Sequence, residues 1–135
     1  MMPLTINDVP ILCINKAAVE YFVPAKIIIS VLKIENGHIG TASHNKNGTV
    51  DLGPMQINSA WLPTLVHYGF TQEDVQYNPC KNVEIGAWIL STSIANEITV
   101  QKGIGDYNSH TTYYNLAYSG KVLSELSHIE NIIGS

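Results

Sequence analysis

A glutamate at the end of an apolar helical stretch is the residue of this sequence best suited to acid–base chemistry. Residues 24–35 carry apolar side chains at three- and four-residue spacing, which places Glu35 on one helix face with Ile27, Ile28, Val31 and Leu32. Apolar neighbours disfavour the charged carboxylate, and so does the negative end of the helix dipole. A carboxyl group that stays protonated near neutral pH can act as a general acid. Taken alone, such a residue is more often an ordinary boundary glutamate paired with a lysine.

The polar segment 45–58 supplies a second group of candidates. It is dense in side chains that hydrogen-bond hydroxyl and acetamido groups, and Gly53-Pro54 predicts a backbone bend that a ligand can approach closely. Asp51 is the only carboxylate that follows Glu35 closely in sequence, so it is the candidate for a second acidic group in glycosidic-bond cleavage. The alternatives are a polar turn that leads into a helix cap and an aspartate that braces a loop.

Composition argues against several classes of protein. The 135 residues are 45% hydrophobic and 13% charged, as expected for one compact domain over residues 1–135. A net charge of -4 without a basic run argues against nucleic-acid binding, and the apolar stretch 27–34 is too short for membrane insertion. The N-terminus lacks a basic region followed by an apolar one. The protein is therefore either never exported or a mature form whose signal has been replaced by a starting Met.

The elements that must position these residues are mostly helices. Asn7 or Asp8 can cap a first helix that runs to about residue 22. In the helix that carries Glu35, Pro24 suits the first position and Gly37 suits the left-handed stop.

Further along the chain, Asn47-Gly48 is typical of a two-residue hairpin turn within residues 38–53. Gly86 inside a later helix indicates close helix packing, and Trp88 is expected in the core. The remaining expected elements are helices over 58–69, 79–98 and 112–132, a short capped turn from Thr71 to Asp74, and a loop or single turn over 103–110. The sum is an α+β fold, predominantly α-helical, with one small β-hairpin.

The two cysteines have two readings. In a reducing cytosol, Cys13 and Cys80 are small core residues with free thiols. In an oxidising compartment, one disulfide would tie the first helix to the helix that begins near residue 79. Closing a loop of this length contributes roughly 4 kcal/mol.

Several segments together resemble one enzyme family, the soluble lytic transglycosylases. The likeness is strongest to the small, single-domain branch found with type IV secretion, conjugation and pilus systems, and it covers about residues 11–123. The segments that carry it are Glu35-Asn-Gly37, Asp51-Leu-Gly-Pro-Met-Gln-Ile-Asn58, Asn78-Pro-Cys-Lys-Asn82, Gly86-Ala-Trp-Ile-Leu90, Asp106-Tyr-Asn-Ser109 and Tyr118.

The resemblance implies a goose-lysozyme-like fold and action on the β-1,4 bond between N-acetylmuramic acid and N-acetylglucosamine in peptidoglycan. It makes Glu35 the catalytic acid and then the base, which yields a 1,6-anhydro sugar. Tyr107 aligns with the tyrosine that faces the catalytic glutamate. The substrate-binding residues predicted on this basis are Asp51, Met55, Gln56, Asn58, Tyr107 and Asn108.

The chain departs from the family pattern at three places. Asn36 stands where the family usually has Ser, and Pro54 stands where Leu is common. The usual Tyr-Asn-Ala-Gly reads Tyr107-Asn-Ser-His110, so we expect a differently shaped loop there. None of these changes removes the acid.

The resemblance also bears on cellular context. It favours a Cys13–Cys80 disulfide and a periplasmic location, with peptidoglycan strands and components of a secretion, conjugation or pilus apparatus as partners. We expect a monomer without a cofactor. We also expect no metal, because no histidines occur at metal-binding helical spacing. A muramidase that uses water and Asp51, a weakly active peptidoglycan-binding scaffold and a cytosolic helical interaction protein are the alternatives.

Overall fold

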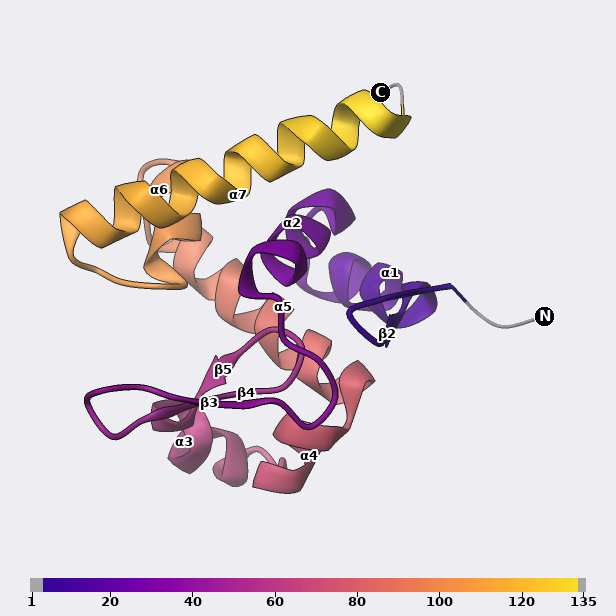
Figure 1. The fold of residues 1–135 in the computed structure, drawn as a ribbon, viewed down its shortest axis with the longest axis vertical. Coiled ribbons are helices and arrows are strands. Elements are labelled where there is room, and N and C mark those ends of the chain that lie inside the picture. The colour runs from indigo at the N-terminus through magenta and orange to yellow at the C-terminus, as the bar shows by residue number, and fades with distance from the viewer. Residues whose placement is uncertain (1–3, 134–135) are drawn as a thin grey trace.

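A computed structural model describes residues 4–133. The chain forms a mainly helical α+β structure, as the sequence predicts (Figure 1). In chain order the elements are β1 (Thr5–Ile6), β2 (Val9–Pro10), α1 (Ile11–Tyr21), α2 (Ala25–Glu35), β3 (Ala42–His44), β4 (Val50–Leu52), β5 (Ile57–Asn58), the 3-10 helix η1 (Ser59–Trp61), α3 (Leu62–His67), α4 (Gln72–Tyr77), α5 (Pro79–Ala95), α6 (Val100–Asp106) and α7 (Thr112–Ile133).

Helix α5 runs through the middle of the molecule. It packs against α1, α4 and α6, while α7 packs across α2 and α6. Figure 1 shows α7 along one edge and β3, β4 and β5 with α3 and α4 at the opposite edge. The buried apolar residues form one core between these layers, to which α2 and α5 contribute most. None of the helices in the described range 4–133 is long and apolar enough to cross a membrane.

Helix α2 delivers Glu35 to the boundary between the helices and the sheet. Ile27, Ile28, Val31 and Leu32 are buried, so the apolar face that the spacing predicts is confirmed. The left-handed residue at its end is Asn36 (φ 57°, ψ 30°), whereas Gly37 was expected to have that conformation. Asn tolerates this region better than most residues. Gly37 is required for a different reason, because a Cβ there would collide with the Gly53 carbonyl oxygen.

The first helix begins later than the sequence predicts. Asn7 and Asp8 do not cap α1; they form the turn of the β1–β2 hairpin, with φ of 51° and 69°. Asn7 Nδ2 donates to the carbonyls of Leu32 and Gly37, both at 3.0 Å. It therefore satisfies carbonyl groups at the C-terminal end of α2 rather than amides at the start of α1. The preference of Asn and Asp for both helix caps and left-handed turns explains the error.

The second sheet has three strands where one hairpin was expected. β3 pairs with β4 and β4 with β5, all antiparallel, and Asp51 lies opposite Asn58. The β3–β4 connection spans residues 45–49, so the predicted two-residue Asn47-Gly48 turn is wrong. Asn47 Oδ1 accepts hydrogen bonds from the backbone N and the hydroxyl of Thr49 within that loop.

The helices between residues 59 and 95 form close to where the sequence predicts them. Asn58 caps η1, Thr71 and Asp74 form a reciprocal capping box on α4, and Asn78 caps α5. Helix α5 ends at Ala95, three residues before the expected end.

Gly86 has a different neighbour from the one expected. A Cβ there would collide with the sulfur of Met55 rather than with another helix.

Residues 103–106 are helical rather than a loop. Thr99 caps α6 by accepting a hydrogen bond from Lys102 N, and the helix runs to Asp106. Its two glycines lower the intrinsic helix propensity, which is why the sequence suggested a loop. Packing overrides the propensity: a Cβ on Gly103 would collide with the backbone of Ile94, and one on Gly105 with the side chain of Asn115.

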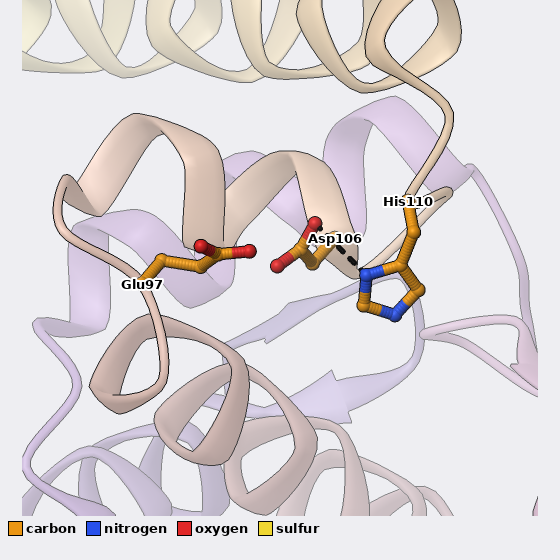
Figure 2. A group of neighbouring side chains, drawn as sticks. All are labelled: Glu97, Asp106 and His110. Atoms are coloured by element: carbon orange, nitrogen blue, oxygen red, sulfur yellow. Dashed lines mark ion pairs between the residues drawn. The ribbon is translucent and has the colours of Figure 1, made fainter.

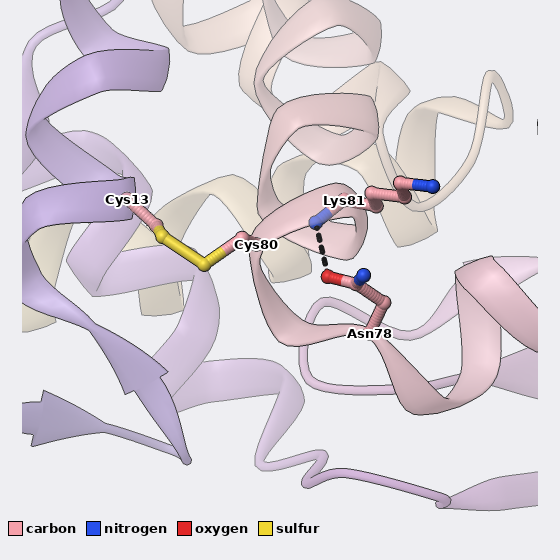
Figure 3. Close-up of a disulfide and its surroundings, with 4 residues drawn as sticks. All are labelled: Cys13, Asn78, Cys80 and Lys81. Atoms are coloured by element: carbon pink, nitrogen blue, oxygen red, sulfur yellow. Dashed lines mark hydrogen bonds between the residues drawn. A yellow bond between two sulfur atoms is a disulfide. The ribbon is translucent and has the colours of Figure 1, made fainter.

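The two cysteines form a disulfide that joins α1 to α5 (Figure 3). Cys80 follows Pro79 in the first turn of α5, where Asn78 Oδ1 accepts from Lys81 N at 3.0 Å. This observation selects the disulfide over the free thiols that a cytosolic interaction protein would have.

Candidate active site

A cleft of about 420 Å³ lies between the end of α2, the β-sheet and the segment after α6. Of the seven residues that the sequence predicts as catalytic or substrate-binding, six line it: Glu35, Asp51, Gln56, Asn58, Tyr107 and Asn108. The sheet side also contributes Asn45, Asn47 and Thr49, and Trp61 and Ile89 contribute apolar surface. Residues more than 70 positions apart in the sequence thus face one cavity.

Glu35 has the character of a neutral acid. The pKa of its carboxyl is raised to about 7, mainly because burial removes water from the charged form, and the negative charge of Asp51 adds to the rise. A hydrogen bond from the Tyr118 hydroxyl to Glu35 Oε2, 2.7 Å long, acts in the opposite direction. The carboxyl is therefore poised to be protonated or ionised near neutral pH.

Two stacked tyrosines stand beside this carboxyl. The rings of Tyr107 and Tyr118 lie 6.4 Å apart between centroids with an interplanar angle of 17°. Burial and the charge of Glu35 raise the pKa of both phenols well above the usual value, so each stays a hydrogen-bond donor. Only Tyr118 donates to Glu35; the Tyr107 hydroxyl donates to the Met55 carbonyl at 2.7 Å.

Asp51 is held within a network of amide and hydroxyl groups. Asn58 Nδ2 donates to Asp51 Oδ1 and to Thr49 Oγ1, both at 3.0 Å. Asn58 Oδ1 accepts from Ala60 N to cap η1. Asp51 thus braces the sheet, as the structural alternative suggested, and it lines the cleft as well.

Gln56 holds the bend between β4 and β5. It adopts a positive φ of 54°, which is uncommon for a residue with a side chain. Its Nε2 donates to the carbonyls of Gly53 at 3.0 Å and Asp51 at 3.3 Å. Gly53 itself has φ +70°, and a Cβ there would collide with the side chain of Asn82. The predicted bend therefore exists and is fixed from both sides.

Met55 is the predicted substrate-binding residue that lies elsewhere. Its side chain is fully buried and packs against Gly86, so it does not line the cleft. The backbone of Met55 links the bend to two helical segments: Met55 N donates to Asn82 Oδ1 at 2.8 Å, and the Met55 carbonyl accepts from the Tyr107 hydroxyl. Methionine is suited to filling a core gap of this kind.

The segment after α6 is secured by a buried asparagine. Asn115 Nδ2 donates to the Lys102 carbonyl, Asp106 Oδ1 and the Ser109 carbonyl at 2.8–3.1 Å. This amide connects α7 to the turn that carries Tyr107 and Asn108.

Glu97, which precedes α6, Asp106 at its end and His110 after it form a cluster (Figure 2). Their ligand atoms lie within 4.8 Å of one another, so they are the group in the described chain that could hold a cation. His110 pairs with Asp106 at 3.2 Å and Lys102 pairs with Glu97 at 3.7 Å. A hydrogen bond with Asp106 is the main cause that raises the pKa of Glu97.

Tyr118 is the residue whose role sequence reasoning missed. It belongs to the family-like segments, but no sequence spacing connects it to Glu35, 83 residues earlier. The periodicity of α7 offered a signal, because Asn115, Tyr118, Ser119 and Val122 form its buried face.

Several known proteins are similar in sequence to this chain. The chain is similar to the invasion protein IagB of Salmonella typhimurium, with 29% identity over 110 residues that cover 81% of this chain and 69% of IagB. Protein IpgF of Shigella flexneri is 29% identical over 101 residues, or 74% of this chain and 66% of IpgF. A peptidoglycan-binding-like protein of Escherichia coli O157:H7 is 29% identical over 105 residues, or 72% and 63% of the two chains.

Residues 12–115 match the family profile described as the transglycosylase SLT domain. Because this match spans well over half of the sequence, the chain belongs to the transglycosylase SLT domain family and has its lysozyme-like fold.

Proposed function

We propose that this protein is a peptidoglycan lytic transglycosylase and that Glu35 is its catalytic residue. The observation that carries the proposal is a carboxyl group with a pKa of about 7, hydrogen-bonded by Tyr118, in a cleft lined by amide and hydroxyl side chains. Such side chains suit the hydroxyl and acetamido groups of a glycan strand.

In the proposed reaction, protonated Glu35 donates its proton to the bridging oxygen of the β-1,4 bond between N-acetylmuramic acid and N-acetylglucosamine. The C1–oxygen bond breaks and the muramic sugar gains positive character. The 6-hydroxyl oxygen of the same sugar then bonds to C1, and its proton passes to the Glu35 carboxylate. The product is a 1,6-anhydro ring, no water is consumed, and the enzyme regains its starting protonation state.

The surrounding residues have supporting roles in this proposal. Tyr118 orients the Glu35 carboxyl, and Gln56, Asn58, Asp51, Tyr107 and Asn108 contact the glycan. The sugar's own acetamido group can assist at C1 in place of a protein nucleophile. A muramidase reaction, in which Asp51 and water take part and reducing ends form, is the competing candidate because Asp51 lines the same cleft.

The cellular setting follows from the substrate and from the relatives. We infer a periplasmic protein that opens the cell wall locally for a secretion, conjugation or pilus apparatus. Support comes from the disulfide, which is typical of oxidising compartments, and from similarity to a protein named for invasion.

Product analysis tests the proposal. Purified peptidoglycan is digested with the wild-type protein and with Glu35→Gln, and the products are identified by mass spectrometry. We expect anhydro-muropeptides from the wild type alone. Reducing-end products would support the muramidase, and intact glycan in both digests with binding retained would support the scaffold.

A further inference from the structure

A second pocket, here called the aromatic pocket, lies on the other side of the Trp61–Trp88 pair from the cleft. It has a volume of about 390 Å³ and is lined by Tyr21, Tyr68, Phe70, Trp88 and Glu84 together with two aliphatic side chains. Trp61 lines the cleft, Trp88 lines the aromatic pocket, and the two rings pack edge to face at 5.5 Å. The proposed glycan chemistry uses no residue of this pocket.

The aromatic side chains that line this pocket are not fully buried in the hydrophobic core. Tyr68 is 67% exposed, and its ring centroid lies 6.4 Å from that of Trp88. Trp88, Phe70 and Tyr21 are only partly buried where they pack against the core. A concave group of partly exposed aromatic residues of this kind is a usual feature of a binding site.

The charge in the aromatic pocket is negative. Within the described part of the chain, Glu84 is the only charged residue in its lining. Burial raises the pKa of Tyr21, and the negative charges of the nearby Glu20 and Glu84 raise it further. Among residues 4–133, neither glutamate forms an ion pair with a lysine. Lys16 and Lys81 line an adjacent depression beside the disulfide, which Glu20 and Glu84 line as well, and Lys81 pairs with Asp74.

We propose that the aromatic pocket binds the side chain of a lysine or arginine from a partner protein. A cation placed over the face of Trp or Tyr is stabilised by the ring quadrupole, and a nearby carboxylate adds a charge-assisted hydrogen bond. The pocket lacks the amide side chains that line the glycan cleft, so a neutral sugar finds fewer hydrogen-bond partners there. The inference is independent of catalysis, because the aromatic pocket and the cleft share no lining residue among those described.

The test is a titration of the whole protein by NMR with N-acetyl-lysine amide and N-acetyl-arginine amide. N-acetyl-norleucine amide, which has a similar apolar chain without the charge, is the control ligand. We expect saturable shifts of the Trp88 indole N–H and of the backbone amides of residues 68–70 and 84–88 with both cationic probes. The dissociation constants should be millimolar and should rise with salt.

Matched variants identify the residues responsible. Glu84→Gln should weaken binding of the cationic probes by about tenfold, whereas Glu73→Gln, an exposed carboxylate outside the pocket, should change it by less than about twofold. Tyr68→Leu keeps an apolar side chain at an exposed position and should weaken binding several-fold. Glu35→Gln should bind the probes as the wild type does.

Three results would overturn the proposal. Equally strong binding of N-acetyl-norleucine amide would show that the pocket is merely apolar and that the charge has no role. Unchanged binding in Glu84→Gln would do the same. Shifts of these resonances with an N-acetylglucosamine trimer but not with the cationic probes would make the pocket a sugar subsite instead.

Discussion

The two walls of the cleft place a carboxyl group in opposite surroundings. On the helical wall, Glu35 ends an apolar face of α2 and receives one hydrogen bond, from the hydroxyl of Tyr118. On the sheet wall, Asp51 sits in a strand whose neighbours are amides and hydroxyls, and it accepts from Asn58. The surroundings, rather than the type of side chain, therefore distinguish the proposed proton donor from a carboxylate that braces the sheet.

The two walls also differ in how they are built. The helical wall is assembled from α2 and α7, which are far apart in sequence and meet through buried apolar residues. The sheet wall is local: residues 45–58 provide its strands, its turn and its polar network. Gly37 lies where the walls meet, against the carbonyl oxygens of Gly53 and Pro54.

The largest expected contrast between the walls is in activity. Glu35→Gln removes the proposed proton donor and should lower the rate of glycan cleavage by about 10³-fold or more. Asp51→Asn keeps an oxygen that can accept from Asn58 and should cost about tenfold or less. Turnover of labelled peptidoglycan measures both variants under one set of conditions. Equal losses would mean that Asp51 takes part directly in the chemistry.

The raised pKa of Glu35 should also be visible in stability. Its folded pKa of about 7 lies above the ordinary value of 4.5, so the folded state binds more protons between these pH values. The free energy of unfolding therefore falls as pH rises from about 4.5 to about 7, by at most about 3 kcal/mol. Glu35→Gln lacks this loss, so urea unfolding should show the variant gaining on the wild type across that window. A constant difference between the two proteins would contradict the raised pKa.

The junction between the walls should tolerate no added atom. Gly37→Ala places a methyl group against backbone carbonyls that cannot move independently, so we expect a loss of about 2–3 kcal/mol in the free energy of unfolding. Gly120→Ala is the matched control, because a Cβ there meets nothing within 4 Å and α7 should gain about 0.5–1 kcal/mol in helix propensity. Urea denaturation compares the two. A Gly37→Ala protein as stable as the wild type would mean that the walls are not in fixed contact.

The two tyrosines of the helical wall should behave differently despite their stacking. Tyr118→Phe removes the hydrogen bond that lowers the pKa of Glu35, so the decline of activity with rising pH should move to higher pH. The rate should also fall a few-fold as the carboxyl loses its orientation. Tyr107→Phe removes a bond to the Met55 carbonyl instead, so that decline should keep its position. A pH–rate profile for each variant distinguishes them, and identical shifts would mean that Tyr118 has no special role.

Sequence reasoning was strongest where the determinants are local. The apolar face of α2, the capping arrangement of Thr71 and the bend at Gly53 depend on neighbouring residues, and each is present. Six of the residues predicted from the sequence together with the family resemblance line one cleft.

It failed where distant contacts decide. Asn7 serves the end of α2 instead of the start of α1, and Gly86 makes room for Met55. Helix α6 forms in spite of its glycines because Ile94 and Asn115 pack directly on them. No local pattern specifies such partners, and the Tyr118–Glu35 bond belongs to the same class.

The proposed role of Glu35 as a neutral acid is tested most directly by measuring the pKa of its carboxyl. The side-chain carboxyl carbons of the glutamates are labelled with ¹³C and followed by NMR from pH 3 to pH 9, with the Glu35→Gln spectrum assigning the Glu35 signal. We predict that this signal titrates with a pKa of about 7. A midpoint near the ordinary value of 4.5 would show that the helical wall does not hold the carboxyl protonated, and the proposed role of Glu35 as the proton donor would fail.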